Sequence, residues 1–348
     1  MLAAGRKEER GRVSDPLLRV EEMRVHFPLR RHSLLSAPQT VRAVDGVSFA
    51  VPRGRTFGIV GESGSGKTTT ALAVMRLIDI TSGRVWLAGE ELSALEGEQL
   101  RAARSRVQMI FQDPYSSLNP RMRAGAIVEE PMQRMHIGAE DERRERARAL
   151  FEQVGQREDQ LQLFPHQFSG GQRQRIGIAR ALATKPELVV CDEPVSALDV
   201  AIQAQILNLL AELQRQHQLT YLFISHDLGV VQYLCDDVAV MYLGRMVEHA
   251  TREALFEDPL HPYTWALLSA VPRMGRRRRG GIARVRVEGD PPSPINPPPG
   301  CRFSARCPFA EARCRAEEPL LRELKPGQRV ACHLVRDDGS APHRPAAL

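Results

Sequence analysis

The sequence predicts an α/β fold with a doubly wound, mostly parallel sheet at its core. Residues 188–191 and 221–224 are short and wholly apolar, which is typical of parallel strands buried on both faces. The segment AIQAQILNLLAELQRQ between them has the apolar spacing of an amphipathic helix. A glycine-rich turn joins the apolar segment 56–60 to TTTALAVMRLI, which also has helical spacing. Because strands alternate with helices, we expect a doubly wound sheet.

Two further elements are expected around this core. Residues 17–27 and 41–51 alternate between apolar and polar side chains, as half-buried strands do, and residues 30–40 between them form a loop. From about residue 96 the sequence becomes charged and amphipathic, notably in EDERRERARALFEQVG. This composition predicts an inserted helical subdomain over about 96–170.

The chain of 348 residues is long enough for one large domain with an appendage. Residues 1–16 are polar and are expected to be a flexible tail, and the main domain then covers 17–272. The stretches RRRRGG and PPSPINPPPG cannot continue a helix, so 273–300 is expected to be a stiff linker. A small cysteine-rich module is predicted over 301–335, followed by a second tail over 336–348.

The formal net charge is +6, but the densest basic run, residues 276–279, lies in a glycine-flanked stretch without interleaved aromatic residues. Such a run is usually a solvated segment, so we expect no nucleic acid partner. No stretch approaches the roughly 18 to 20 apolar residues that cross a bilayer, and the amino end lacks the apolar core of a signal peptide. We therefore expect a cytoplasmic protein that reaches the membrane by docking onto membrane-spanning partners.

A phosphate-binding loop is predicted between the apolar segment 56–60 and the following helix. The motif G-x-x-x-x-G-K-[ST] needs this context, because its glycines let backbone N–H groups converge on phosphate oxygens at a helix N-terminus. Lys67 would bridge the outer phosphates, and the Thr68 hydroxyl would be a ligand of Mg²⁺. The predicted ATP-binding residues here are Gly61, Glu62, Ser63, Gly64, Ser65, Gly66, Lys67, Thr68 and Thr69.

A phosphate loop also needs a carboxylate for the metal on a neighbouring strand. The sequence LVVCDEP supplies Asp192 at the end of an apolar run. The next residue, Glu193, is placed to polarise an attacking water as a general base. Pairs of acidic residues after strands also occur as helix caps, so the pair alone does not decide between the two roles.

The sequence FSGGQRQR at 168–175 resembles the signature motif of ABC ATPases. Other family elements follow in the expected order. Gln112 in FQDP matches the glutamine that senses Mg²⁺ and the transporter, SALD at 196–199 matches the D-loop, and His226 in ISHD matches the switch histidine. The resemblance implies a P-loop ABC ATPase with a mostly parallel sheet core, an antiparallel β subdomain, an inserted helical signature subdomain and a small Cys-containing C-terminal module.

The resemblance also implies how the residues act. Two subunits would bind head to tail, so that the signature residues of one contact the γ-phosphate of ATP held by the other. Lys67, Glu193 and His226 are the implied catalytic residues. The implied Mg²⁺ ligands are Thr68, Gln112 and Asp192, the signature residues acting in trans are Ser169, Gly170, Gly171 and Gln172, and the D-loop residue is Asp199.

One expected element is missing from the sequence. The family usually stacks adenine on an aromatic residue ahead of the strand at 41–51, but the segment SAPQTVR offers none. Phe27 and His32 are the alternatives, and the position stays unassigned.

The stretches AVDGVSF, FQDPYSSLNPRM, DVAIQAQILNLL, FISHDLGVV, MYLGRMVE and HPYTWALLSAVP are similar to the ATPase subunits of bacterial dipeptide and oligopeptide importers, and within them to the second of two paired ATPases. This resemblance implies ATP hydrolysis that energises peptide import, at the cytoplasmic face of the inner membrane. The implied partners are a sister ABC ATPase in a heterodimer, two membrane permease subunits and a substrate-binding protein.

Two alternatives remain open. Related importers carry nickel, glutathione or other small solutes, and the ATPase does not contact the cargo. A non-hydrolysing regulatory subunit is the other alternative, but such subunits usually lose residues that are present here, Glu193, Gly170 and Gly171.

Four of the six cysteines lie close together in the tail, with spacings C-x5-C-x6-C-x17-C. These spacings match neither ferredoxin runs nor the tight C-x2-C pairs of zinc sites, yet clustered thiolates could hold a metal in a reducing cytoplasm, with His333 as a substitute ligand. The family resemblance implies a 4Fe–4S cluster on Cys301, Cys307, Cys314 and Cys332. Cys191 and Cys235 are expected to be core residues.

Overall fold

The computed structural model describes residues 15–29, 39–270, 287 and 289–341. The basic run at 276–279, His32, and most of the predicted amino-terminal tail and of the loop at 30–40 lie outside the described residues.

Within the described residues, the core is an eight-stranded sheet in the order β11-β12-β10-β9-β3-β8-β7-β6. The pairs from β9 through β3, β8 and β7 to β6 are parallel, whereas β10, β12 and β11 continue the sheet antiparallel. The mixed α/β fold and its parallel core therefore agree with the sequence prediction. The strands are β3 (Thr56–Val60), β6 (Val107–Ile110), β7 (Leu188–Asp192), β8 (Thr220–Ser225), β9 (Asp237–Tyr242), β10 (Arg245–Thr251), β11 (Arg322–Lys325) and β12 (Gln328–Val330).

The residues of β3, β7 and β8 are all buried because both faces of the sheet are covered. Their side chains alternate between two apolar clusters, so that Val189 and Cys191 belong to one and Leu188 and Val190 to the other. The first cluster includes the helices α5 (Gly170–Leu182), α6 (Val200–His217), α7 (Leu228–Leu234), α8 (Arg252–Glu257) and α9 (Pro262–Ala270). The second includes α1 (Lys67–Val74) and the smaller sheet.

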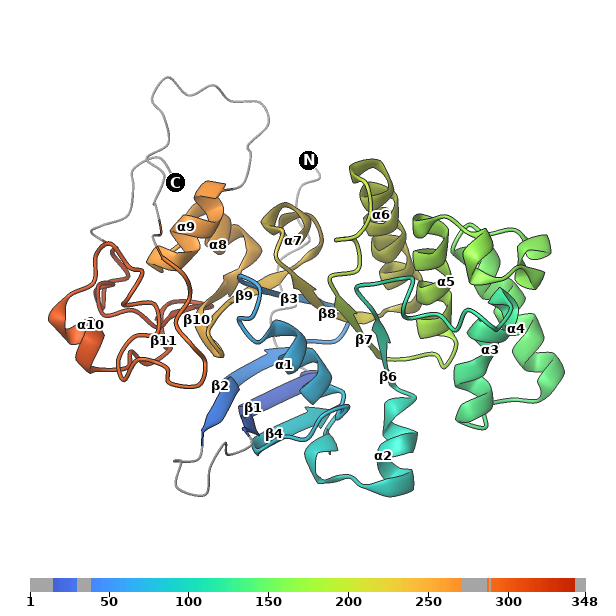
Figure 1. The fold of residues 1–348 in the computed structure, drawn as a ribbon, viewed down its shortest axis with the longest axis horizontal. Coiled ribbons are helices and arrows are strands. Elements are labelled where there is room, and N and C mark those ends of the chain that lie inside the picture. Colours follow the sequence, from blue (N-terminus) through green and yellow to red (C-terminus); the bar gives the residue numbers. More distant parts are fainter. Residues whose placement is uncertain (1–14, 30–38, 271–286, 288, 342–348) are drawn as a thin grey trace, which may run out of the picture.

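The smaller sheet is antiparallel, in the order β2-β1-β4-β5, and packs beside α1 (Figure 1). Its strands are β1 (Leu18–Pro28), β2 (Thr40–Val51), β4 (Ser82–Leu87) and β5 (Glu90–Glu91). Phe49 of β2 stacks on Phe57 of β3 with ring centroids 4.8 Å apart, which joins the two sheets. The alternating segments predicted as half-buried strands therefore form this β subdomain.

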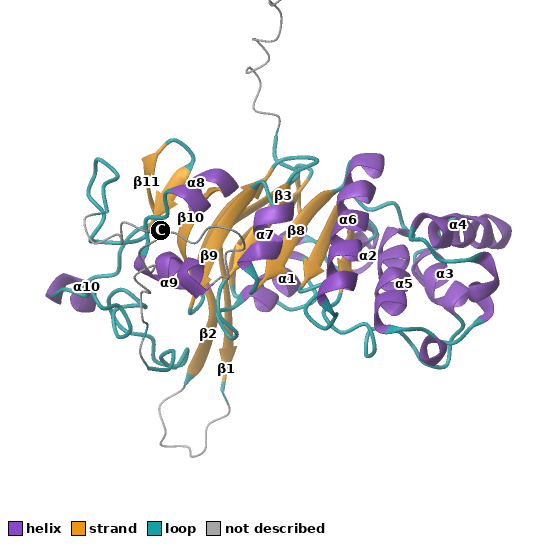
Figure 2. Cartoon of the chain, turned by 90° about the horizontal axis from the view of Figure 1, so that it is seen from above, coloured by secondary structure: helices purple, strands orange, loops and turns teal. Residues whose placement is uncertain are grey.

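The helical region is less continuous than its sequence predicts. Between α2 (Gly97–Arg104) and α3 (Ala124–Arg134) the chain forms β6, which is the edge strand of the core sheet. A strand of four residues is too short to show a period of two, so its sequence does not distinguish it from the flanking helices. The helices α3 and α4 (Glu140–Gln153) then extend away from the core at one end of the molecule (Figures 1 and 2).

The cysteine-rich segment does not stand apart from the main domain. Its strand β12 pairs with β10 and with β11, so the segment extends the core sheet. Cys301, Cys314 and Cys332 belong to the same apolar cluster as the core strands, and the short helix α10 (Ala312–Ala316) lies at the outer end (Figure 1). None of the helices in the described part of the chain has the length and apolarity that a membrane span needs.

Candidate nucleotide-binding site

The predicted phosphate loop lies between the carboxyl end of β3 and the amino end of α1. A Cβ on Gly61 would lie 2.2 Å from the Met241 carbonyl oxygen, and one on Gly66 would lie 2.3 Å from the Ala43 carbonyl oxygen. Gly66, which precedes the helix, also has φ +105°, a conformation that favours glycine. Both glycines are therefore needed for the loop to pass this close to neighbouring backbone.

Lys67 is held within the loop. Its Nζ donates hydrogen bonds to the carbonyl oxygens of Gly61 at 2.8 Å and Glu62 at 2.9 Å, and the residue is only 5% exposed. Burial lowers the pKa of Lys67, while nearby carboxylates, Glu193 foremost, oppose that change. A buried ammonium at the amino end of a helix is well placed to bind phosphate oxygens.

The predicted metal ligands Thr68 and Asp192 meet across the end of the sheet. The Thr68 hydroxyl donates to Asp192 Oδ1 at 3.1 Å. Burial raises the pKa of Asp192, and the hydrogen bond from Thr68 opposes that rise. A hydroxyl and a carboxylate in contact are oxygen donors of the kind that Mg²⁺ prefers.

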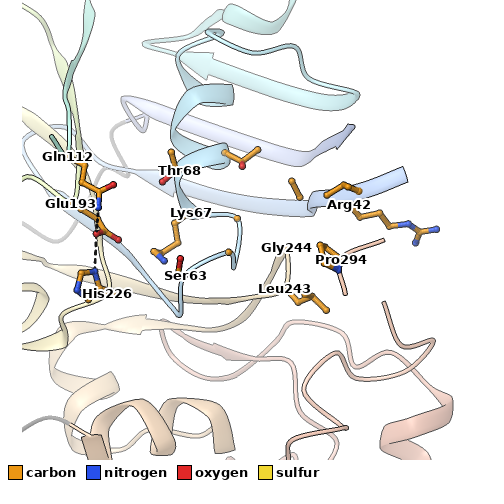
Figure 3. A pocket seen from close by; sticks show the side chains of 15 residues that line it. Arg42, Ser63, Lys67, Thr68, Gln112, Glu193, His226, Leu243, Gly244 and Pro294 are labelled. Atoms are coloured by element: carbon orange, nitrogen blue, oxygen red, sulfur yellow. Dashed lines mark hydrogen bonds and ion pairs between the residues drawn. The ribbon is translucent and has the colours of Figure 1, made fainter. Parts of the chain in front are cut away.

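The Glu193 carboxylate lies between the side chains of Gln112 and His226. Its Oε2 accepts a hydrogen bond from Gln112 Nε2 at 3.1 Å and lies 3.0 Å from His226 Nδ1 (Figure 3). The Glu193 backbone has φ +46° and its N–H donates to the Ile224 carbonyl oxygen at 2.9 Å, so the neighbouring strand holds this strained conformation. Three separate strand ends thus bring Gln112, Glu193 and His226 together.

One cavity of about 510 Å³ is lined by Lys67, Thr68, Gln112, Glu193 and His226, whereas Asp192 is not among its lining residues. Gln112, Glu193 and His226 lie at one end, Lys67 and Thr68 in the middle, and Arg42, Leu243, Gly244 and Pro294 at the other end (Figure 3). The residues present fit a nucleoside triphosphate with Mg²⁺, because the Lys67 ammonium can bind phosphate oxygens, and the Thr68 hydroxyl and Asp192 carboxylate are oxygen donors for the metal. The buried Ser65 hydroxyl also has no hydrogen-bond partner among the described residues.

The signature residues lie outside this cavity. Ser169 caps α5, since its Oγ accepts from Gln172 N at 3.3 Å and the Gln172 Oε1 accepts from Ser169 N at 2.9 Å. Ser169 is exposed, whereas Gly171 is buried against Ile202. None of residues 169–172 lines the cavity. Asp199 caps α6 by accepting from Ile202 N at 3.0 Å.

Several lining residues were not predicted from the sequence. Val41, Arg42 and Ala43 come from β2, Leu243 and Gly244 from the turn between β9 and β10, and Pro294 from the carboxy-terminal segment. Tyr263 is also close, because its hydroxyl accepts from Glu62 N at 2.8 Å. No motif marks these positions. Phe27, one of the two adenine-stacking alternatives, is 42% exposed on β1 and does not line the cavity.

The four tail cysteines do not form a metal centre here. Among the described residues, no group of three or more His, Cys, Asp or Glu side chains is placed to hold a metal ion. Burial raises the pKa of Cys301 and Cys307 to about 11 and that of Cys332 to about 12, which favours neutral thiols. His333 Nε2 instead bonds to the Glu317 carbonyl oxygen at 3.0 Å. The residues as placed do not fit the predicted iron–sulfur cluster. Cys191 and Cys235 are buried core residues, as expected.

The fold and the cavity define the class of protein as a P-loop ATPase of the ABC type. Comparison with known proteins agrees: residues 44–196 match the family model described as ABC transporter, and residues 247–314 match the oligopeptide/dipeptide transporter, C-terminal region. The dimeric, post-hydrolysis structure of the ATP-binding cassette MJ0796 with ADP and Pi is 26% identical with a TM-score of 0.60. That match covers 68% of this chain and 98% of the other.

Curated relatives extend the likeness over nearly the whole chain. A probable peptide ABC transporter ATP-binding protein of Sinorhizobium fredii is 51% identical, over 97% of this chain and 95% of the relative. The oligopeptide transport ATP-binding protein AppF of Bacillus subtilis is 48% identical, over 92% of this chain and 98% of the relative. The chain belongs to the ATP-binding proteins of peptide ABC transporters. It is an ABC-type ATPase, which implies ATP as the substrate and Mg²⁺ as the cofactor.

Proposed function

We propose that this chain hydrolyses ATP to energise the import of dipeptides or oligopeptides. The observation that carries the proposal is the combination of one cavity, lined by Lys67, Thr68, Gln112, Glu193 and His226, with a carboxy-terminal region of the peptide-transporter type. The named relatives, which share about half of their residues with this chain over nearly its full length, support the peptide cargo.

In the proposed reaction the chain's own residues bind phosphate and activate water. Lys67 donates to the outer phosphate oxygens after exchanging its two backbone acceptors for them. Thr68 and Asp192 would hold Mg²⁺, which would neutralise charge on those oxygens when bound. Glu193 orients the attacking water and accepts its proton. His226 Nδ1 donates to the Glu193 carboxylate, so Nε2 can also donate to a phosphate oxygen when the ring carries a second proton.

We propose that the working unit contains two ATPase subunits, of which this chain is one. Ser169 is exposed at the start of α5 and lies outside the cavity of its own chain. It is therefore free to contact ATP that is bound by a second subunit. The dimeric assembly of the related cassette supports this arrangement. The second subunit is proposed to be a sister ATPase, and the pair would dock on two permeases at the cytoplasmic face of the inner membrane, supplied by a substrate-binding protein.

The experiment that tests this function isolates the tagged full chain from membranes in mild detergent. Co-purifying proteins are identified by mass spectrometry, and ATP turnover is measured with and without peptide-loaded binding protein. Recovery of a sister ATPase and two permeases, with turnover stimulated by peptide, is the expected result. Stimulation by nickel or glutathione instead would reassign the cargo, and recovery of no membrane protein would contradict the transporter assignment.

The iron–sulfur cluster implied by the resemblance stays a prediction. After burial, the neighbouring Cys314 and Cys307 also raise the pKa of Cys301, but no group of these cysteines among the described residues is placed to hold a metal ion. Anaerobic purification followed by iron, sulfide and zinc analysis tests it. About four irons and four sulfides per chain would support the cluster, and protein without metal would end the prediction.

A further inference from the structure

None of the described residues that line the base end of the nucleotide cavity has an aromatic side chain. Its lining residues are Val41, Arg42, Ala43, Leu243, Gly244 and Pro294. The planar base of a nucleotide is bound by apolar surface that excludes water from its face, and an aromatic ring that stacks on the base usually supplies this surface. Pro294 is the one ring among these residues. It comes from a segment more than two hundred residues away from the phosphate loop in sequence.

Pro294 is fixed to the wall of the cavity by the backbone. Its carbonyl oxygen accepts a hydrogen bond from Arg42 N at 3.1 Å, so the segment runs beside the start of β2. Pro294 is half-buried, whereas Pro291 on the same segment is exposed and does not line the cavity. The proline ring is therefore held at the cavity by a contact that does not depend on its own side chain.

Arg302, further along the same segment, joins this segment to β2 and to the β9–β10 turn. It is only 5% exposed, forms an ion pair with buried Asp45 of β2, and donates through Nη1 to the Leu243 carbonyl oxygen. The turn at Gly244 is tied in as well, since Gly244 N donates to the Ser65 carbonyl oxygen at 2.8 Å and Asp45 N to the Gly244 carbonyl oxygen at 2.9 Å. These bonds join β2, the β9–β10 turn and the carboxy-terminal segment into one surface.

The same segment also reaches the phosphate loop. Arg306 Nη1 lies 2.8 Å from Glu62 Oε2, and Arg306 is only 10% exposed at its side chain. The carboxy-terminal segment thus touches the nucleotide cavity at its base end and the loop at its phosphate end. A tail that only extended the sheet would need neither contact.

We propose that the carboxy-terminal segment is an integral part of the nucleotide site, and that the ring of Pro294 packs against the base of ATP in place of an aromatic side chain. This inference rests on the proposed nucleotide site. Pro294 is a binding residue in this scheme, and Arg302 is a positioning residue that keeps Leu243 and β2 beside it.

The test compares ligands with and without a base. Binding of Mg-ADP and of inorganic tripolyphosphate to the full-length chain is measured by calorimetry and by competition against a fluorescent nucleotide. Pro294→Ala is expected to weaken ADP binding about fivefold, or about 1 kcal/mol of lost apolar contact, and to leave tripolyphosphate binding unchanged. Pro291→Ala is the matched control and is expected to change neither affinity.

A second variant enlarges the ring at position 294 instead of removing it. Pro294→Tyr offers a larger ring at the same backbone position and is expected to bind ADP at least as tightly as the wild type. Unchanged or tighter ADP binding by Pro294→Ala would overturn the inference, as would an equal loss for ADP and tripolyphosphate, which would place the defect in the phosphate loop. Wild-type chain that binds neither ligand would instead overturn the nucleotide site itself.

Discussion

The two ends of the nucleotide cavity are built differently. At the catalytic end, Gln112, Glu193 and His226 each follow a strand of the parallel core, and Glu193 touches the other two directly. At the base end, Arg42, Leu243 and Pro294 come from an antiparallel strand, a turn and a distant segment. The catalytic end depends on side-chain chemistry that few residue types supply, whereas the base end depends on shape, which many sequences can supply.

The largest effect is expected at the catalytic end. Glu193→Gln keeps the size of the side chain but removes the base, so ATP turnover is expected to fall about 10²- to 10⁴-fold. ATP binding by the variant should stay close to that of the wild type, because Lys67 and the loop glycines are unchanged. Turnover by the assembled complex and binding by calorimetry are the two measurements. Turnover at the wild-type rate would show that another group is the base.

At the base end, the substitution of Arg302 is expected to lower the stability of the fold rather than to change the chemical step of ATP hydrolysis. Arg302→Met leaves the buried Asp45 carboxylate without its most buried partner, so the free energy of unfolding is expected to fall by about 3 kcal/mol. Arg313→Met is the control, because its ion pair with Glu317 is about 60% exposed on both sides and should be worth less than about 1 kcal/mol. Urea unfolding of the full chain measures both. Equal losses of unfolding free energy in the two variants would mean that the ion pair of Arg302 with Asp45 stabilises the fold no more than an exposed pair does.

The link between the carboxy-terminal half and the phosphate loop is expected to be sensitive to acid. Burial lowers the pKa of His261 to about 3, and its Nδ1 accepts from Tyr263 N at 3.0 Å in the turn that holds Tyr263 against Glu62. Because the folded-state pKa lies below the ordinary value near 6.5, neutral His261 contributes stability above pH 6.5. That contribution is lost as the pH falls from 6.5 towards 3.

The variant His261→Asn tests this acid sensitivity, since asparagine can accept from the same N–H but does not titrate. Below pH 6.5 the free energy of unfolding of the wild type should fall more steeply than that of the variant, by about 1.4 kcal/mol per pH unit. Glu248, whose pKa burial raises to about 7, acts in the opposite sense in both proteins. Parallel curves of unfolding free energy against pH would contradict the assignment.

The smallest effect concerns Asp199, which caps α6 and is also the predicted D-loop residue. Asp199→Ala removes the cap and should cost about 1 kcal/mol of stability, whereas Asp199→Asn keeps an acceptor and should cost only a few tenths. Thermal unfolding and ATP turnover of the assembled complex separate the two roles. Asp199→Asn with normal stability and normal turnover would leave Asp199 as a helix cap only.

Much of the catalytic end could be predicted because its chemistry constrains the sequence locally. The phosphate loop needs glycine where no side chain fits, as at Gly61 and Gly66, and it must join a strand to a helix, so the motif and its context can be recognised together. Asp192 could be placed at the end of an apolar run from the sequence, whereas Gln112 and His226 could be identified only by their resemblance to family motifs. Their mutual contacts were not predicted, because the strand order is a tertiary property.

The sequence by itself determined the α/β class, the smaller sheet, the phosphate loop and the family, because strand and helix periods and glycine constraints act over a few residues. Only the tertiary structure decided that β6 belongs to the core sheet, that β12 joins β10, and that Pro294 lines the nucleotide cavity. It also left the four tail cysteines, which lie within 33 residues of sequence, without metal-binding geometry. Pairing and packing between distant segments depend on which surfaces remain to be buried once the local elements have formed, and no short pattern records that.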